Sequence, residues 1–179
     1  MANEQTAVFG GGCFWCIEAV FQRLTGVTHV ESGYMGGGAG QATYRQVCNG
    51  DTGHVEVVRV TFDPDRISYR ELLEVFFAVH DPTTLNRQGN DSGEQYRSVI
   101  FYSDEEQQMI AENTIAELTA AKEYSEPIVT AVEPAEEFHA AEGYHQNYYN
   151  ENSRQPYCMF VISPKLVKLE KKFAEKLRA

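Results

Sequence analysis

Residues 54–63, HVEVVRVTFD, constrain the fold of this chain more than any other stretch. With the period of two that a β-strand imposes, positions 56, 58, 60 and 62 share one face and positions 55, 57, 59 and 61 share the other. The pattern predicts a strand. Shorter apolar runs at residues 6–10, 27–34, 97–103 and 127–134 predict further strands.

Helices are predicted between these strands. After Cys13, apolar residues recur at helical spacing as far as Leu24, and Gly26 suits the position just past a helix end. Residues 67–81 open with Ser68 and Glu71 at capping-box spacing, which predicts a second helix.

Three further segments carry helical signals. Ser103 and Glu106 repeat the capping-box spacing and predict a helix that runs to about Lys122. Ser163 and Pro164 are predicted to be the N-cap and first residue of an amphipathic helix over residues 163–177. Residues 136–152 form a weaker helical stretch.

This order of elements predicts an α+β fold in a single domain, residues 1–179, with helices packed on a mixed sheet. A chain of 179 residues is long enough for one core and too short for two. Residues 81–96 lack periodicity and are rich in turn formers, so they predict either an ordered functional loop or a flexible connector.

Charge and hydropathy exclude several classes of function. The net charge is −11, and six of the 15 basic residues lie within residues 165–178, so nucleic-acid binding has no electrostatic support. The sequence predicts no membrane span and no signal peptide, and cytoplasm is the expected location. Four cysteines in a reducing compartment are expected to be free, catalytic or metal-bound.

Cys13 follows a glycine run at 10–12 and precedes the first predicted helix. Unpaired N–H groups and the helix dipole at such an N-terminus stabilise a thiolate, which is the nucleophilic form of cysteine. Cys13 is therefore predicted to be a nucleophile, and a buried, inert cysteine is the alternative.

Cys16 completes a C-x-x-C spacing that allows a disulfide one helical turn away. A thioredoxin-like redox module and a structural zinc site are competing interpretations. Zinc is disfavoured because Cys48 and Cys158 form no second close pair, and no metal is predicted. His80, His139 and His145 also lack the spacing of a helical zinc site.

Glu56 shares its strand face with apolar side chains. If that face meets the core, burial raises the pKa of the carboxyl group, as a general acid near neutral pH requires. If position 56 is instead the rim of the strand, the carboxylate emerges into solvent. Together, Cys13 and Glu56 suggest nucleophilic attack assisted by proton donation.

The chain resembles the A-type peptide methionine sulfoxide reductases. The resemblance runs through GGCFW at 11–15, GY at 33–34, TYRQVCNGDTGHVE at 43–56, FDP at 62–64, HDPTTLNRQGNDSGEQYRS at 80–98, and HQNYY with YC between 145 and 158. It implies a ferredoxin-like two-layer core with extensions. It also implies reduction of methionine-S-sulfoxide, free and in proteins.

The resemblance implies roles for individual residues. Cys13 would attack the sulfoxide sulfur and become a sulfenic acid as methionine leaves. Glu56 would donate a proton to the sulfoxide oxygen, and Tyr44 and Tyr96 would hydrogen-bond to that oxygen.

Asp91 would hold the substrate backbone, and Phe14 and Trp15 would form the walls around its methyl group. A second thiol would then form a disulfide with Cys13, for which Cys158 is preferred over Cys16.

The resemblance further implies that thioredoxin, or dithiothreitol in vitro, supplies the electrons, with no bound cofactor and a monomeric protein. Cys48 is expected to be structural. Two alternatives stay open: a general disulfide oxidoreductase built on Cys13 and Cys16, and a non-catalytic zinc or peptide-binding module.

Overall fold

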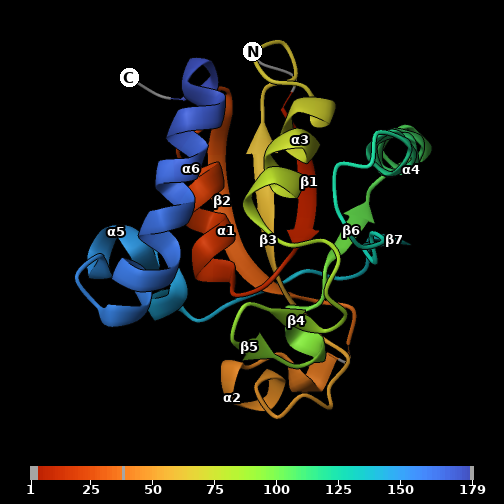
Figure 1. The fold of residues 1–179 in the computed structure, drawn as a ribbon. Coiled ribbons are helices and arrows are strands. Elements are labelled where there is room, and N and C mark those ends of the chain that lie inside the picture. Colours follow the sequence, from red (N-terminus) through yellow and green to blue (C-terminus); the bar gives the residue numbers. More distant parts are fainter. Residues whose placement is uncertain (1–3, 38, 178–179) are drawn as a thin grey trace.

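A computed structural model describes residues 4–37 and 39–177, in which helices pack on a mixed β-sheet (Figure 1). The six strands pair in the order β7-β6-β1-β3-β2-β8, and only β6 and β7 run parallel. Their bounds are β1 (Gln5–Gly10), β2 (Val27–Met35), β3 (Val55–Phe62), β6 (Val99–Tyr102), β7 (Ala131–Pro134) and β8 (His139–Ala140). The predicted α+β class with a mixed sheet is confirmed.

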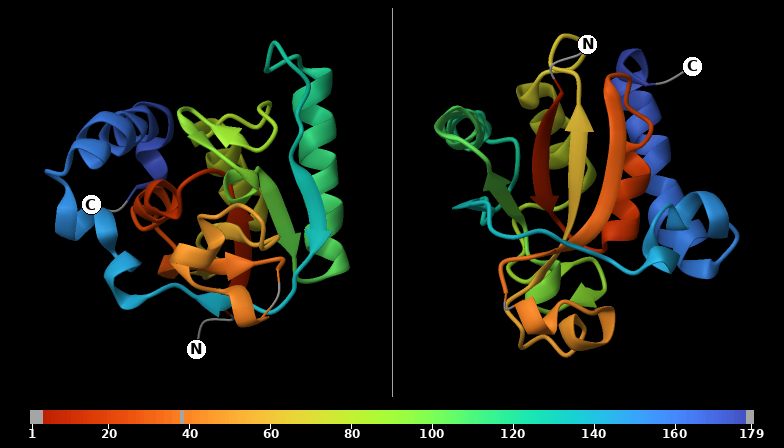
Figure 2. Two further views of the ribbon diagram at one scale, coloured as in Figure 1. Left: turned by 90° about the horizontal axis from the view of Figure 1, so that it is seen from below. Right: turned by 180° about the vertical axis from the view of Figure 1, so that it is seen from behind.

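The α-helices of the described residues are α1 (Phe14–Phe21), α2 (Tyr44–Val47), α3 (Tyr69–Val79), α4 (Glu105–Ala120), α5 (Tyr148–Asn152) and α6 (Ser163–Phe173). Helices α1, α3 and α6 cover one face of the sheet, and α4 lies beside β6 and β7 (Figures 1 and 2). None of the described helices is both long and apolar enough to cross a membrane.

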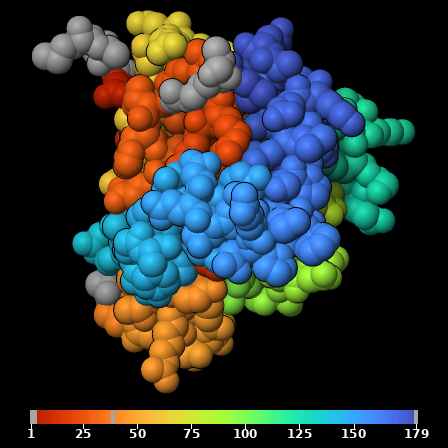
Figure 3. All heavy atoms as spheres, turned by 90° about the vertical axis from the view of Figure 1, so that its left-hand side faces the viewer, coloured from red at the N-terminus to blue at the C-terminus, as the bar shows by residue number. Residues whose placement is uncertain are grey.

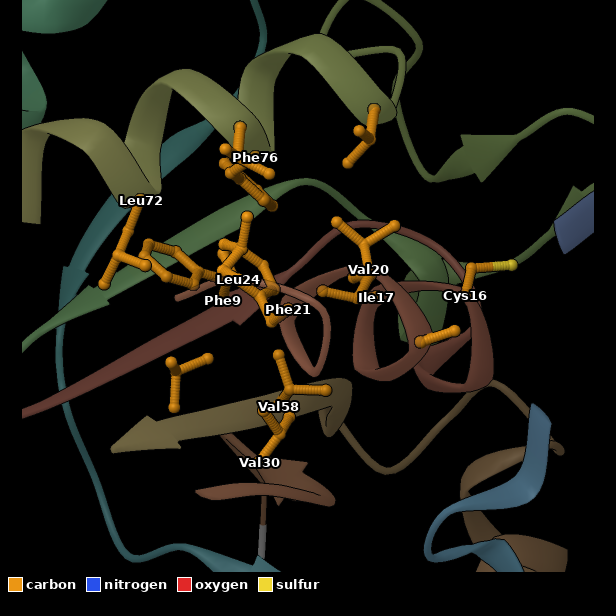
Figure 4. Packing of buried hydrophobic residues seen from close by; sticks show 14 of the residues in the cluster. Phe9, Cys16, Ile17, Val20, Phe21, Leu24, Val30, Val58, Leu72 and Phe76 are labelled. Carbon is orange, nitrogen blue, oxygen red and sulfur yellow. The ribbon is translucent and has the colours of Figure 1, made fainter. Parts of the chain in front are cut away.

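The main core lies between the sheet and the helices α1, α3 and α6 (Figure 4). Phe9 of β1 stacks on Phe21 of α1 at 5.3 Å and on Phe76 of α3 at 5.1 Å between ring centroids. Val58 of β3 packs into the same cluster, whereas Val57 faces a smaller cluster on the other side of the sheet. The face of residues 56, 58, 60 and 62 is thus fully buried, whereas the other face is buried at Val55 and Val57 and partly exposed at Arg59 and Thr61.

The helix α4 corrects one prediction. Asp104, and not Ser103, is its N-cap, because the Asp104 side chain accepts a hydrogen bond from the Gln107 backbone N–H at 2.8 Å. An aspartate caps as well as a serine, and its charge favours the helix N-terminus. The helix ends at Ala120, two residues before the predicted end at Lys122.

Residues 136–152 are predicted to be one helical stretch, and this prediction is wrong. They form β8, a 3₁₀ turn (Gly143–His145) and the five-residue α5. Pairing of β8 with the edge of β2 competes with helix formation, and Asn147 has a left-handed backbone with φ of 57°.

The C-terminal helix also begins earlier than predicted. A π-helical turn (Cys158–Ile162) runs directly into α6. The N-cap residue of α6 is therefore Ile162, and the predicted N-cap Ser163 is the first residue of the helix. The helix ends at Phe173, and Leu177 forms an isolated bridge with Leu24. The π-helical turn packs beside α1, whereas residues 153–156 before it are exposed.

Residues 81–96 form an ordered loop, the first of the two predicted alternatives. It contains a hairpin, β4 (Arg87–Gln88) and β5 (Asp91–Ser92), followed by a 3₁₀ turn (Glu94–Tyr96). This loop lies at the same end of the molecule as the start of α1 (Figure 1).

The cap assignment at α4 makes a direct prediction. Asp104→Ala removes the acceptor for the Gln107 N–H and should lower the free energy of unfolding by about 1 kcal/mol. Ser103→Ala is the matched control and should change it by less than about 0.5 kcal/mol. Urea denaturation measures both, and a larger loss from Ser103→Ala would contradict the assignment.

Candidate active site

Cys13 lies at the N-terminus of α1, shortly after the end of β1, as the sequence predicts. Cys13 is the N-cap residue of α1, with extended backbone. Gly12 before it has φ of +93°, and a Cβ there would lie 2.9 Å from the Gln88 side chain. Its N–H donates to the Tyr96 carbonyl at 3.2 Å, which joins the helix start to the 81–96 loop.

Glu56 is completely buried, which decides between the two interpretations of its position in favour of the core. Its Oε1 accepts a hydrogen bond from the Phe14 backbone N–H at 3.1 Å, at the first turn of α1. Its Oε2 is buried and has no hydrogen-bond partner among the described residues.

Burial raises the pKa of Glu56 to about 8, although the Phe14 N–H opposes the shift. Negative charge on Asp91 and Cys16 raises it further. The carboxyl group therefore keeps its proton at neutral pH. Because Oε1 already accepts the Phe14 N–H, Oε2 is the oxygen that is free to carry that proton.

The two thiols of the C-x-x-C pair share a hydrogen bond. Burial raises the pKa of Cys13 well above its usual value, and the hydrogen bond to Cys16 raises it further. The same bond, together with the Lys165 ammonium, lowers the pKa of Cys16 to about 7. Burial thus opposes the thiolate predicted at Cys13, against the stabilising effect of the helix N-terminus, and within the pair Cys16 has the lower pKa.

Tyr96 lies near Glu56 and Cys13, and Tyr44 lies near Glu56 and hydrogen-bonds to Cys48. The pKa of each phenol is raised, first by burial and also by negative charge on Glu56. Tyr44 is the first residue of α2 and is held by its backbone N–H, which donates to Glu142 at 3.0 Å. The structure thus brings together the four residues that the resemblance places at the sulfoxide oxygen and sulfur.

Phe14 and Trp15 form an aromatic wall with His145. The Trp15 indole N–H donates to His145 Nδ1 at 3.0 Å, and its ring stacks on Tyr148 at 3.8 Å. Phe14 is fully buried, with its ring centroid 5.2 Å from that of His145. These contacts fix the orientation of the Trp15 ring.

Asp91 accepts a hydrogen bond from the Tyr157 hydroxyl at 2.6 Å. The same hydroxyl lies 3.6 Å from Cys16 Sγ, so Tyr157 connects the 81–96 loop to the thiol pair. Neither Tyr157 nor Tyr148 is predicted from sequence to be part of the site, and His145 is considered there only as a zinc ligand and rejected. Their presence in the segments HQNYY and YC is the signal that could have identified them.

The other two cysteines differ from each other in exposure. Cys158 opens the π-helical turn, is fully buried, and belongs to the same core cluster as Cys13 and Cys16. Cys48 was expected to be structural but is exposed, because the short α2 ends at the surface there. All four cysteines are free thiols.

A groove of about 740 Å³ opens onto Cys13 and Cys16. The 81–91 segment forms one wall and residues 157–168 form the other, and these segments meet on the face shown in Figure 3. The sulfur of Cys16 points away from the packed core (Figure 4). No group of three or more His, Cys, Asp or Glu side chains within residues 4–37 and 39–177 is arranged to hold a metal ion.

Comparison with known proteins gives consistent matches along the chain. The family model for peptide methionine sulfoxide reductase matches residues 5–177. Peptide methionine sulfoxide reductase MsrA of Chromobacterium violaceum is 58% identical over 174 residues, which cover 97% of this chain and 99% of that protein. The protein of that name from Deinococcus radiodurans is 56% identical over 177 residues, which cover 99% of this chain and 86% of the relative.

Solved structures agree with these matches. Reduced Mxr1 from Saccharomyces cerevisiae has a TM-score of 0.79 and 32% identity, covering 87% of this chain and 89% of its own. Methionine sulfoxide reductase A of Corynebacterium diphtheriae has a TM-score of 0.74 and 35% identity, covering 85% of this chain and 76% of its own. Mxr1 has also been solved in complex with Trx2. By these matches, the chain belongs to the peptide methionine sulfoxide reductase family, whose members are oxidoreductases.

Proposed function

We propose that this protein reduces methionine-S-sulfoxide, free and in proteins, by thiol chemistry at Cys13. The observation that carries the proposal is the state of Glu56, a buried carboxyl group with one oxygen held by the start of α1 and the other unpaired among the described residues. A group of this kind can give a proton to a sulfoxide oxygen while a neighbouring sulfur attacks.

The first step begins with proton transfer within the thiol pair. The Cys16 thiolate takes the proton of Cys13 across their hydrogen bond, which leaves Cys13 as the nucleophile. Cys13 then attacks the sulfoxide sulfur, so a bond forms between the two sulfurs while Glu56 protonates the sulfoxide oxygen. The hydroxyl group passes from the methionine sulfur to Cys13 as the bond between the two sulfurs breaks, which leaves a sulfenic acid on Cys13 and releases methionine. Tyr44 and Tyr96 hydrogen-bond to the oxygen during the transfer.

Substrate binding uses the aromatic wall and the 81–96 loop. Phe14 and Trp15 enclose the methyl group of the sulfoxide, and Asp91 accepts the substrate backbone N–H. Because Asp91 already accepts the Tyr157 hydroxyl, substrate must displace or share that hydrogen bond.

The sulfenic acid is resolved by Cys16 in this proposal, in place of the Cys158 preferred from sequence. Both candidates are buried, but Cys16 is hydrogen-bonded to Cys13 and lines the same groove, whereas Cys158 does not line it. The Cys16 thiolate, re-formed by loss of its proton, attacks Cys13 sulfur. The sulfenic hydroxyl leaves as water after taking that proton, and an S–S bond forms.

Thioredoxin is the proposed reductant of this disulfide, with no bound cofactor. The complex of the structural relative Mxr1 with Trx2 supports this assignment. The four free cysteines are consistent with a reducing compartment, and cytoplasm remains the proposed location.

The cysteine assignments predict three different single-turnover results. Without reductant, Cys13→Ser should release no methionine. Cys16→Ser should release one methionine per protein, more slowly because the proton acceptor for Cys13 is lost, and accumulate a sulfenic acid, whereas Cys158→Ser should still form the Cys13–Cys16 disulfide. Mass spectrometry of dimedone-treated protein distinguishes these species, and a Cys13–Cys158 bridge in the wild type would restore the assignment made from sequence.

The proton donor predicts the pH dependence of the oxygen-transfer rate. The rate should rise through about pH 7 as Cys16 becomes a proton acceptor and fall through about pH 8 as Glu56 loses its proton. Glu56→Gln should lower the rate by about 10² to 10⁴-fold and remove the falling limb. Glu18→Gln replaces another buried carboxyl group, bonded to the Asn147 and Tyr148 N–H groups, and should keep that limb. Stopped-flow tryptophan fluorescence measures the rate, and an unchanged profile in Glu56→Gln would refute the role.

A further inference from the structure

The wall of the thiol groove formed by the C-terminal segment is both apolar and basic. Phe160 is 77% exposed, and Val167 is 48% exposed on the first half of α6. Phe160, Lys165 and Lys168 line the groove, and Val167 and Lys171 lie in the neighbouring hollow on α6, which shares Lys168 with it. Large exposed apolar side chains ringed by charge are typical of protein interaction sites.

The positive charge on this wall is available to a partner. Neither Lys165 nor Lys168 forms an ion pair with any residue in 4–37 or 39–177. The carboxylates on the opposite wall are already engaged, Asp81 by the Thr83 N–H at 2.9 Å and Asp91 by the Tyr157 hydroxyl. In a chain of net charge −11, this is where the basic residues concentrate.

The groove reaches both sulfurs of the thiol pair. Its lining shares Asp91 with the proposed substrate site, but it contains none of Tyr44, Glu56 and Tyr96, which surround the proposed sulfoxide oxygen. A molecule in the groove therefore faces the disulfide bond rather than the oxygen-binding groups. That position suits a thiol that reduces the disulfide.

We propose that Phe160, Lys165, Val167, Lys168 and Lys171, here called the reductant face, form the docking surface for a dithiol protein whose reactive cysteine is surrounded by acidic and apolar residues. This inference rests on the proposed function and assigns its reductant to one surface. The acidic remainder of the chain repels such a partner, whereas the reductant face attracts it, so the charge distribution orients the encounter.

The exchange that this docking permits is balanced. The partner's thiolate attacks Cys16 sulfur, an intermolecular S–S bond forms, and Cys13 leaves as a thiolate. The second thiol of the partner then loses its proton and attacks the partner's first sulfur, which is bonded to Cys16. Cys16 leaves as the thiolate, the Cys13 thiolate takes the proton, and the partner is left as a disulfide.

Charge reversal on the reductant face tests the proposal with steady-state kinetics. Lys168→Glu should raise the KM for thioredoxin by about tenfold, and Phe160→Ser by about fivefold. Turnover of free methionine sulfoxide with dithiothreitol should stay within about twofold of wild type for both variants. Arg66→Glu makes the same charge change on the exposed turn before α3 and should leave the KM for thioredoxin unchanged.

Ionic strength provides a second readout. The KM for thioredoxin should rise with salt in the wild type and rise less in Lys168→Glu. An unchanged KM in Lys168→Glu and Phe160→Ser would overturn the reductant face. The reductant face would also be overturned if the variants raised the KM for an oxidised protein substrate, measured with dithiothreitol, and left the KM for thioredoxin unchanged. If wild type turns over no sulfoxide with dithiothreitol, the proposed function fails, which is a separate result.

Discussion

The hydrogen bond from the Phe14 backbone N–H to Glu56 Oε1 joins the two halves of the site. The donor belongs to the first turn of α1, next to Cys13. The acceptor Glu56 is the second residue of β3, which lies between β1 and β2 in the sheet. A free N–H at a helix start needs an acceptor, and a buried carboxyl oxygen needs a donor. One contact satisfies both needs and fixes the acid relative to the nucleophile.

This contact also limits how the acid can be used. A helix N-terminus favours the carboxylate, yet burial in the core dominates and the proton stays on Glu56 near neutral pH. With Oε1 occupied, the proton lies on Oε2, which has no other acceptor among the described residues. The same competition acts on the neighbouring sulfurs, where burial raises the pKa of Cys13 and the hydrogen bond between the thiols lowers that of Cys16.

Features that depend on local spacing could be predicted from sequence. The period of two in β3, the capping box at Ser68 and Glu71, and the position of Cys13 at a helix start are all local patterns, and the structure contains them. Residues 136–152 have a helical composition, but pairing at the sheet edge is a tertiary interaction that no local pattern reports.

The chemistry of the site was harder to predict for the same reason. Whether Glu56 was rim or core depended on what covered the strand end, and the charge of the thiol pair depended on how deeply each sulfur was buried. Tyr157 is distant in sequence from both Asp91 and Cys16, so its contact with them follows only from the packing of the C-terminal segment.

The proposed chemistry requires Glu56 to hold its proton at neutral pH. Infrared difference spectroscopy on glutamate-labelled protein, with Glu56→Gln as the reference, isolates the carbonyl stretch of this one group. We expect a protonated carboxyl band at neutral pH that is lost with a midpoint near the pKa of about 8. A carboxylate band already complete at mildly acidic pH would contradict it.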